Sequence, residues 1–446
     1  MAQENKSLDV LIINSPLFRD LIEEDDEDSL PPLGLGYIAT DLLSNGITVE
    51  LVDPVNDHIS LNGILAIIRG KRPSYVALNI FTTNMHLVRE IVESVGNTRF
   101  VIGGLATKSI YKNILSWNTN SPVDIVLGEG DFIVSTIVHG KSQGVVYDDG
   151  KNRVIKVATS SPYFPADISN LSLDRSFFSH LTAHPVSGLN EVCIVTSRGC
   201  MYNCAFCAAA RSLNLETPIR ERTAASVEKE IRVLLEQNNT INAIRILDDL
   251  FLRNVRSVER TVKIFGQIPV VWRAMAHVLS FHKLEDAHLL ALKRSGCFEV
   301  FIGIESGSPR ILKKIRKTSD IELIKRTIER LFRFGINVKG YFIFGFESET
   351  SADMEMTYKL AMWFKEASLR TSTRFRTSAF QFRPYHGTEL YHDIVQKGRI
   401  VSDMIPQKLL SRNIGRRQFN FASGNFSEVP DDVLQRFIMS TLNLNW

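Results

Sequence analysis

The chain of 446 residues is close to charge balance, with 52 Lys and Arg against 49 Asp and Glu and a net charge of +3. This balance gives no basic footprint of the kind that nucleic-acid-binding domains carry, so we expect no nucleic-acid partner. No apolar run is long enough to cross a bilayer and the first residues form no apolar signal region, so we expect no membrane partner. With 44% apolar residues the chain can bury two cores, which predicts two or three domains.

Residues 1–165 alternate short apolar segments, rich in β-branched residues, with segments of helix length. This alternation predicts an α/β domain with a Rossmann-like, doubly wound parallel sheet, which binds ligands at the carboxyl ends of its strands. A helix is expected over residues 34–45, because Asn45-Gly46 is a typical helix stop. The expected strands are residues 9–14, 49–52, 75–80, 100–102 and 124–127.

Glycine turns follow two of these strands. Gly103 and Gly104 come after the fourth expected strand, and Gly128 and Gly130 after the fifth. Since glycine has no side chain, the backbone at such a strand end allows a large ligand to approach closely. These four glycines are therefore candidate cofactor-binding residues, although glycine turns are also ordinary structural features of such sheets.

Residues 166–190 contain prolines and polar residues that interrupt any long period, and we expect them to form a linker. Residues 191–385 alternate strand and helix again, as in the repeats of an α/β barrel, whose chemistry lies at the carboxyl ends of the strands. Thr223 is the expected N-cap of a helix that continues to residue 236. Residues 386–446 are expected to form a helical extension. The expected barrel strands are residues 191–196, 243–247, 270–275, 298–304, 339–344 and 378–382.

Three of the five cysteines, Cys200, Cys204 and Cys207, lie in one short loop, Cys-Met-Tyr-Asn-Cys-Ala-Phe-Cys. Three thiolates with this spacing can hold three irons of a 4Fe–4S cluster and leave the fourth iron open to a small chelating molecule. An odd, closely spaced trio cannot pair off as disulfides, and no Cys-x-x-Cys or His pair follows nearby to complete a zinc site. A cluster is therefore favoured, with zinc or purely structural cysteines as the alternatives. This use of cysteine also predicts a reducing, cytoplasmic location.

The loop resembles the Cys-x-x-x-Cys-x-aromatic-Cys signature of the radical S-adenosylmethionine (SAM) enzymes, and Arg198 and Gly199 ahead of it also fit. The resemblance implies that the open iron chelates SAM and that an electron from the cluster cleaves SAM to a 5′-deoxyadenosyl radical. The three cysteines would then be the catalytic metal ligands, and Phe206 would pack near the adenine. An electron donor such as flavodoxin or ferredoxin is implied as a partner.

The other landmarks of this family recur in order over roughly residues 190–390, where six strand–helix units make the partial (β/α)6 barrel typical of it. The aspartate pair after the second barrel strand takes the place of a segment that contacts the SAM amino group, by position rather than by identity. The residues after the fourth strand would contact the ribose or a carboxylate, and those after the fifth would line the adenine. For each acid, a helix N-cap or an ion pair is the alternative. These implied cofactor contacts are Asp248, Asp249, Glu305, Ser306, Gly345 and Glu347.

The first 165 residues resemble the cobalamin-binding domain that precedes many radical SAM enzymes. The matching segments are residues 14–16, 31–37, 103–104 and 128–131. The Asp-x-His-x-x-Gly motif of domains that supply a histidine to cobalt is absent from residues 57–63, as is common among radical SAM members. The resemblance implies cobalamin as a cofactor, but a domain that keeps the fold without the cofactor remains an alternative.

Together the two halves resemble a class B radical SAM methyltransferase. The radical would take a hydrogen atom from an unactivated carbon of a small polar or natural-product substrate, and cobalamin would deliver the methyl group. The barrel positions Arg273, Lys339, Tyr341 and Gln381 are expected to face inward, which suits a polar substrate. The alternative is that half of the inward candidates, which include Glu299, face the helices or pair with each other. The alternatives are a cobalamin-independent dehydration or rearrangement, for example of an aminoglycoside-type sugar, and, more remotely, a non-catalytic cobalamin or iron–sulfur sensor.

Overall fold

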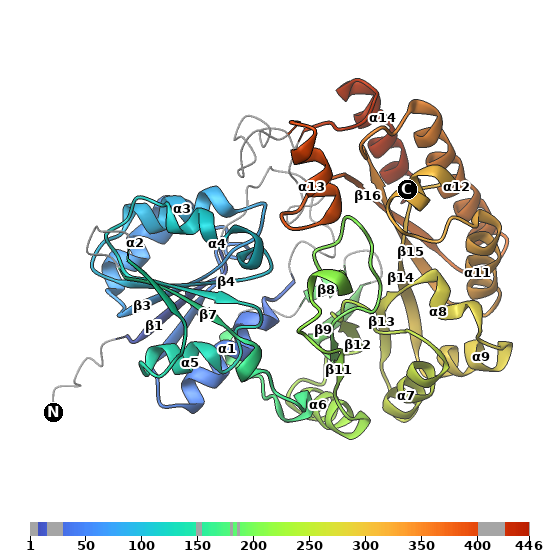
Figure 1. Ribbon diagram of the computed structural model, residues 1–446. Coiled ribbons are helices and arrows are strands. Elements are labelled where there is room, and N and C mark those ends of the chain that lie inside the picture. Colours follow the sequence, from blue (N-terminus) through green and yellow to red (C-terminus); the bar gives the residue numbers. More distant parts are fainter. Residues whose placement is uncertain are drawn as a thin grey trace.

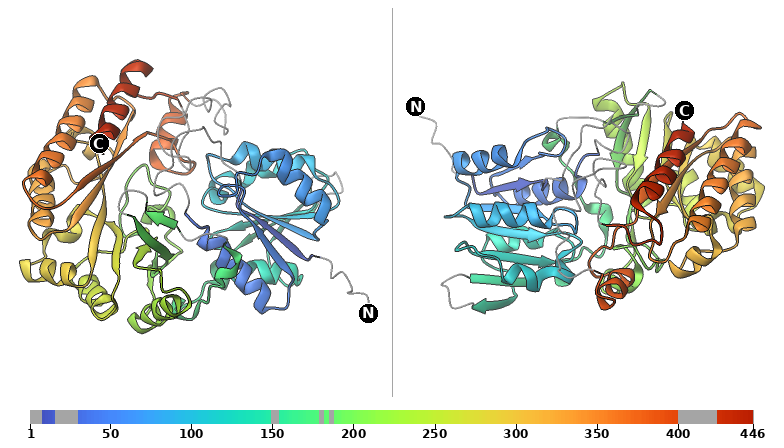
Figure 2. Two further views of the ribbon diagram at one scale, coloured as in Figure 1. Left: turned by 180° about the vertical axis from the view of Figure 1, so that it is seen from behind. Right: turned by 90° about the horizontal axis from the view of Figure 1, so that it is seen from above.

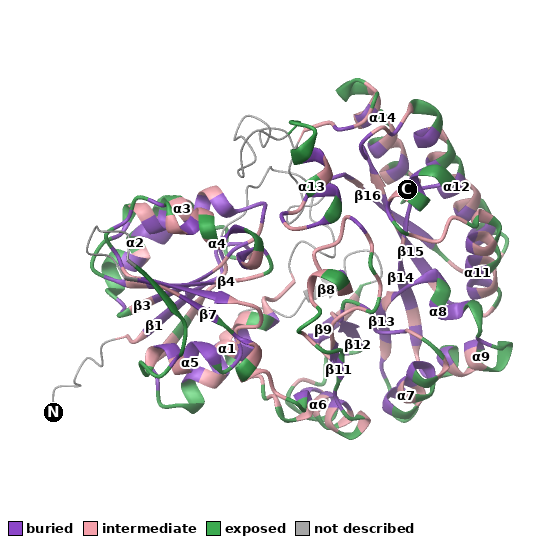
Figure 3. Ribbon diagram, in the orientation of Figure 1, coloured by how far each residue is buried: buried purple, intermediate pink, exposed green. Residues whose placement is uncertain are grey.

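The structure is a computed structural model that describes residues 8–15, 30–148, 154–178, 182–184, 188–399 and 424–445. Two α/β units lie side by side, and each is built around a seven-stranded sheet (Figures 1 and 2). The sheets are buried, while the outward faces of the surrounding helices are exposed (Figure 3). Within the described residues, no helix has the length and apolar character that a membrane span requires.

The first sheet confirms the expected doubly wound architecture. Its strand order is β2-β1-β3-β4-β5-β7-β6, and every pairing is parallel except that of β6 with β7. The strand order reverses between β1 and β3, as in flavodoxin-like sheets, which bind ligands at that point. Sequence analysis did not predict the hairpin β6–β7, which extends the sheet at one edge. The strands are β1 (Val10–Ile13), β2 (Val49–Val52), β3 (Tyr75–Asn79), β4 (Arg99–Gly103), β5 (Val123–Leu127), β6 (Val145–Asp148) and β7 (Val154–Thr159).

Helices cover both faces of this sheet, because its strands are apolar on both sides. Side chains of α2, α3 and α4 pack against one face, and those of α1 and α5 pack against the other. Helix α1 ends at the predicted residue, where the N–H of Asn45 bonds to the last helical carbonyls. The helices are α1 (Leu33–Ser44), α2 (Leu61–Lys71), α3 (Met85–Ser94), α4 (Thr107–Leu115) and α5 (Ile133–Val138).

The second sheet is curled into a partial barrel, which confirms the expected (β/α)6 unit (Figure 1). Its order is β16-β15-β14-β13-β12-β9-β8, and only the edge strand β8 is antiparallel. Strand β8 belongs to the segment that was expected to be a linker. The strands are β8 (Thr182–His184), β9 (Leu189–Ile194), β12 (Ala243–Ile246), β13 (Val271–Ala276), β14 (Cys297–Glu305), β15 (Asn337–Phe344) and β16 (Phe375–Gln381).

The barrel helices bury their apolar sides in one large core. In α6, Val227, Ile231 and Leu234 are buried at helical spacing, and the hydroxyl of Thr223 accepts a hydrogen bond from the N–H of Ser226. Helix α14 packs along β16, so the C-terminal extension closes one side of the barrel. The helices are α6 (Ala224–Gln237), α7 (Val255–Phe265), α8 (Val278–His282), α9 (Asp286–Arg294), α10 (Pro309–Lys314), α11 (Ile321–Arg333), α12 (Ser351–Leu369), α13 (Glu389–Gln396) and α14 (Asp431–Leu442).

A buried layer of charged side chains fills the barrel near the amino ends of its strands. Arg273 donates hydrogen bonds to Glu191, one of them at 2.7 Å, and lies 3.4 Å from Glu299. Arg376 donates to both carboxylate oxygens of Glu299, at 2.9 and 2.6 Å. Burial alone would raise the pKa of Glu299, but these arginines outweigh it and lower the pKa to about 2. Arg273, which was expected to face a polar substrate, is therefore held by carboxylates of the protein.

The charged layer leads to a prediction about the free energy of unfolding. Glu299→Ala removes the carboxylate that neutralises two buried guanidinium groups, so we expect a loss of about 3–5 kcal/mol. The thermal unfolding midpoint should fall by on the order of 10 °C. In the matched control, Glu228→Ala removes an exposed partner of Arg232 at 2.7 Å, and the expected change is within about 0.5 kcal/mol. Equal midpoints for the two variants would show that the layer is not needed for stability.

Candidate active site

The cysteine loop starts and ends in a two-stranded antiparallel ribbon. Strand β10 (Ser197–Arg198) follows β9, and it pairs with β11 (Arg220–Glu221), so the residues between them form the loop. Asp248, at the end of β12, is buried and accepts hydrogen bonds at 2.7 Å from the Thr196 N–H and from the hydroxyls of Thr196 and Ser197. Asp248 thus anchors the start of the ribbon, and these hydrogen bonds occupy both of its carboxylate oxygens.

The three loop cysteines are partly buried and form no disulfide. In the part of the chain that the structure describes, no three His, Cys, Asp or Glu side chains are grouped to enclose a single metal ion, as zinc would require. Burial raises the pKa of Cys204, and that of Cys207 to about 12, so thiolates here need a positively charged partner. Three cysteines are one short of the four ligands of a structural zinc site but can hold a 4Fe–4S cluster, so the donor set fits the cluster better than zinc.

An ion pair lies beside the cysteine loop at the end of β14. Glu305 has a φ of +66°, which is strained for a residue with a side chain, and such strain is often found at functional sites. Its carboxylate lies 3.1 Å from the Nζ of Lys317, which also donates to the Gly303 carbonyl at 2.8 Å. Burial alone would lower the pKa of Lys317, but Glu305 and the thiols of Cys204 and Cys207 raise it. Sequence reasoning missed Lys317, whose only signal was its place in a basic segment after α10.

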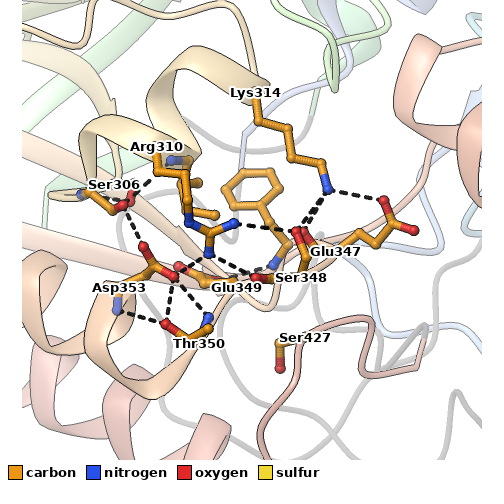
Figure 4. Close-up of polar contacts among 12 residues, drawn as sticks. Ser306, Arg310, Lys314, Glu347, Ser348, Glu349, Thr350, Asp353 and Ser427 are labelled. Carbon is orange, nitrogen blue, oxygen red and sulfur yellow. Dashed lines mark hydrogen bonds and ion pairs between the residues drawn. The ribbon is translucent and has the colours of Figure 1, made fainter.

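A hydrogen-bonded network joins the loops that follow β14 and β15 (Figure 4). The hydroxyl of Ser306 lies 3.1 Å from that of Thr357 and accepts a hydrogen bond from a backbone N–H, also at 3.1 Å. Glu347 forms ion pairs with Lys314 at 2.9 Å and with Lys397 at 2.8 Å. The ion-pair alternative stated for Glu347 is therefore present, and cofactor contacts by Ser306 and Glu347 remain predictions.

The turn after β15 is held by a buried acid that sequence analysis did not identify. Gly345 has a φ of +93°, and its N–H and that of Phe346 donate to the same oxygen of Glu349, at 2.6 and 3.0 Å. Burial raises the pKa of Glu349 to about 8, so its carboxyl group is largely protonated at neutral pH. The ring of Phe206 packs edge-on against Phe346 with centroids 6.0 Å apart, so the cysteine loop rests on this turn.

The raised pKa of Glu349 predicts a pH dependence of stability. The folded chain keeps a proton that the unfolded chain, with an ordinary pKa of 4.5, releases, so stability falls as pH rises from about 4.5 to about 8. We expect Glu349→Gln, which cannot ionise, to reduce the fall in the thermal unfolding midpoint between pH 5.5 and 8.5. Glu355→Gln, at an exposed ion pair with Lys359, should keep the pH profile of the parent chain. Identical profiles for the Glu349 variant and the parent would contradict the assignment.

A cavity of about 640 Å³ lies between the two units, within the size range of ligand sites. On the N-terminal side it is lined by the ends of β1 and β3, where the strand order reverses, and by the turns after β4 and β5. On the barrel side it is lined by the start of the cysteine loop, including Cys200, and by Asp249. The cavity therefore meets the carboxyl ends of both sheets. All four predicted glycines, Gly103, Gly104, Gly128 and Gly130, line it.

Three of these glycines are also required by packing within the N-terminal unit. A Cβ on Gly104, which has a φ of +126°, would lie 2.5 Å from the carbonyl oxygen of Ile80. A Cβ on Gly128, with a φ of +113°, would lie 2.3 Å from the Ser160 hydroxyl. Gly130 is similarly close to the side chain of Ile38. A larger residue at these positions would therefore be strained or crowded.

The two adjacent aspartates after β12 have different surroundings. Asp248 bonds to the ribbon and does not line the cavity, whereas Asp249 lines the cavity beside Cys200. Although the carboxylate of Asp249 is exposed to the cavity, the surrounding protein and the charge of Asp248 raise its pKa. Only Asp249 is therefore placed to meet a ligand there.

Comparison with known families gives two matches. Residues 194–361 match the radical SAM superfamily, and residues 25–138 match the B12 binding domain. The first match corresponds to the barrel with its cysteine loop, and the second to the doubly wound unit.

The chain also resembles individual proteins. It is 26% identical to an uncharacterized methyltransferase of Pyrococcus horikoshii, over 74% of this chain and 73% of the relative. It is 23% identical to the cytidylyl-2-hydroxyethylphosphonate methyltransferase of Streptomyces wedmorensis, over 82% of this chain and 78% of the relative.

Two solved structures share the fold over most of the chain. The cobalamin-dependent SAM radical enzyme OxsB has a TM-score of 0.65 and 15% identity, over 95% of this chain and 65% of OxsB. The radical SAM methyltransferase TsrM from Kitasatospora setae has a TM-score of 0.63 and 16% identity, over 88% of this chain and 76% of TsrM.

The chain therefore carries a radical SAM domain and a B12-binding domain, as its sequence predicted. The two domains imply the expected cofactors, which are a 4Fe–4S cluster, SAM and cobalamin.

Proposed function

We propose that this enzyme is a cobalamin-dependent radical SAM methyltransferase that methylates an unactivated carbon of a small molecule. One observation carries the proposal: a single cavity is lined both by the ligand-binding edge of the B12-binding domain and by Cys200 of the cysteine loop. A methyl carrier and a radical source held there could both reach one substrate carbon. The relatives named methyltransferases support this reaction type.

We assign the cluster to Cys200, Cys204 and Cys207, with SAM on its open iron. When bound, the reduced cluster would supply the electron that cleaves SAM to the 5′-deoxyadenosyl radical. Asp249 in the cavity and the Glu305–Lys317 pair beside the loop are the charged groups that we propose for the polar parts of SAM. The role of the surrounding protein is to orient the reactants and to exclude water from the radical.

We assign cobalamin to the cavity edge formed by Gly103, Gly104, Gly128 and Gly130. None of the cavity-lining side chains among the described residues is a histidine. We therefore expect cobalt to be bound without a protein imidazole, in agreement with the missing Asp-x-His-x-x-Gly spacing.

The electron donor is proposed to approach from the side of the cysteine loop that faces away from this cavity. A groove of about 340 Å³ there is lined by Cys204 and Cys207 of the loop and by Glu389 and Asp393 of α13. A small carrier such as flavodoxin or ferredoxin bound at this groove would bring its redox centre near the cluster. A cytoplasmic location would supply such carriers.

The test uses SAM labelled with deuterium in its methyl group. We expect the anaerobic, cobalamin-loaded chain to form 5′-deoxyadenosine with dithionite, and the corrinoid extracted afterwards to carry the labelled methyl group. Formation of 5′-deoxyadenosine without a labelled corrinoid would contradict methyl transfer and favour a dehydration or rearrangement. Absence of both products would favour a sensor.

The cluster assignment predicts that substitution of one loop cysteine removes both the cluster and the cleavage of SAM. Cys204→Ala should lose the absorption shoulder near roughly 400 nm and should form no 5′-deoxyadenosine, because the cluster lacks one of its three ligands. The control is Cys297→Ala, which removes a buried thiol outside the loop and should keep both properties. A full cluster in the Cys204 variant would show that this assignment is wrong.

A further inference from the structure

Two arginines of the β10–β11 ribbon form ion pairs with the N-terminal unit. Arg198 donates to the two carboxylate oxygens of Asp131, at 2.7 and 3.1 Å, and to Glu129 at 3.1 Å. Arg220 forms an ion pair with Glu129. The side chains of these four residues, which we name the interdomain ion group, are at most 19% exposed. At this burial, solvent and salt screen the charges much less than at the surface.

The ribbon depends on these carboxylates. Its register places Arg198 directly opposite Arg220, and like charges at such positions repel each other. A ribbon of two residues per strand also has no core and is not stable alone. Further contacts come from the same neighbour, because Arg198 lies over the ring of Tyr37 and Arg220 over that of Phe164. The N-terminal unit therefore contributes, together with Asp248 of the barrel, to the conformation in which the ribbon holds the cysteine loop.

The acidic members of the interdomain ion group lie on a glycine turn. Glu129 and Asp131 alternate with Gly128 and Gly130, where an added Cβ would lie 2.3 Å from the Ser160 hydroxyl and 2.6 Å from the Cδ1 of Ile38. The turn therefore packs closely against its own unit.

The interdomain ion group also borders the cavity. Glu129, Asp131 and Arg198 line it, together with Gly199 and Cys200 of the loop. Only one residue, Gly199, separates Arg198 from the first cluster ligand, Cys200. The interdomain ion group is therefore in reach of a ligand in the cavity and adjoins the start of the loop that carries the cluster ligands.

We propose that the interdomain ion group couples cobalamin binding in the cavity to SAM binding at the cysteine loop. Its four members act as positioning residues that set the distance between the two cofactor sites. Cobalamin would fix the turn, the turn would fix the ribbon, and the ribbon would hold the loop in the conformation that binds SAM. By thermodynamic linkage the effect is reciprocal, so SAM tightens cobalamin binding by the same factor. This inference rests on the proposed function, because it requires both cofactors.

The test measures the factor by which SAM changes the affinity for cobalamin. Hydroxocobalamin is titrated into cobalamin-free chain that carries a reconstituted cluster, with and without SAM, and its Kd is read from the corrinoid spectrum. In the parent chain we expect SAM to lower the Kd by about fivefold or more. Arg220→Met removes one charge of the group but does not alter the cavity lining, because Arg220 does not line it. We expect the factor to fall towards one in this variant, with the Kd in the absence of SAM unchanged.

Two further variants separate coupling from simple structural damage. Arg220→Lys keeps the charge and should keep part of the coupling. Arg175→Met removes an ion pair to Glu230 at 2.7 Å, which is similarly buried but lies outside the cavity lining. This variant should keep the full coupling between SAM and cobalamin binding. Glu129→Gln, which weakens the contacts of both arginines, replaces Arg220→Met if that variant does not fold.

Each outcome decides a separate point. The inference would be overturned if SAM lowered the hydroxocobalamin Kd of Arg220→Met by as much as it does in the parent chain. The same holds for Glu129→Gln where that variant replaces Arg220→Met. A parent chain that binds hydroxocobalamin with no response to SAM would also overturn the inference but leave the proposed function standing. A parent chain that binds no hydroxocobalamin at all would refute the proposed function and this inference with it.

Discussion

Two parallel sheets direct the carboxyl ends of their strands at one shared cavity, and this arrangement determines where the functional residues lie. In the N-terminal unit the strand order reverses between β1 and β3, so the loops on either side diverge and leave a space. In the barrel the same geometry brings the cysteine loop after β9 and Asp249 after β12 to the matching side. Neither unit alone would enclose a site of this size.

Buried charges hold this arrangement, and they do so in separate groups. Near the amino ends of the barrel strands, Glu299 and its arginines fill part of the interior. At the carboxyl ends, the Glu305–Lys317 pair lies beside the cysteine loop, and the interdomain ion group lies at the cavity. Removing one partner of such a pair is costly because it leaves the other buried and uncompensated. The charged residues near the cavity therefore contribute to stability, and positioning of the cofactors is the role that we propose for them.

Much of the fold and of the site could be predicted because their signals are local. Alternating apolar segments predicted the parallel strands of both sheets apart from β7, and the spacing of Cys200, Cys204 and Cys207 predicted the cluster loop. The glycine turns could also be located, since each follows a strand.

What could not be predicted depends on contacts between distant segments. Asp248 and Asp249 are adjacent and chemically identical, and only the packing of β12 against β9 shows that the first binds the ribbon and the second lines the cavity. The inward position of Arg273 was predicted, but its carboxylate partners were not, because they come from other strands. Lys317 follows α10 and Glu349 precedes α12, and only their burial and contacts reveal their roles.

The most direct test of this account is the cofactor content of the chain after anaerobic expression with cobalamin supplied. The absorption spectrum shows the cluster, and mass spectrometry of the released cofactor measures the corrinoid. The account predicts about one cobalamin per chain beside one 4Fe–4S cluster. A chain with a full cluster but no cobalamin, even after reconstitution, would contradict it and would make the N-terminal unit a scaffold that has kept its fold without its cofactor.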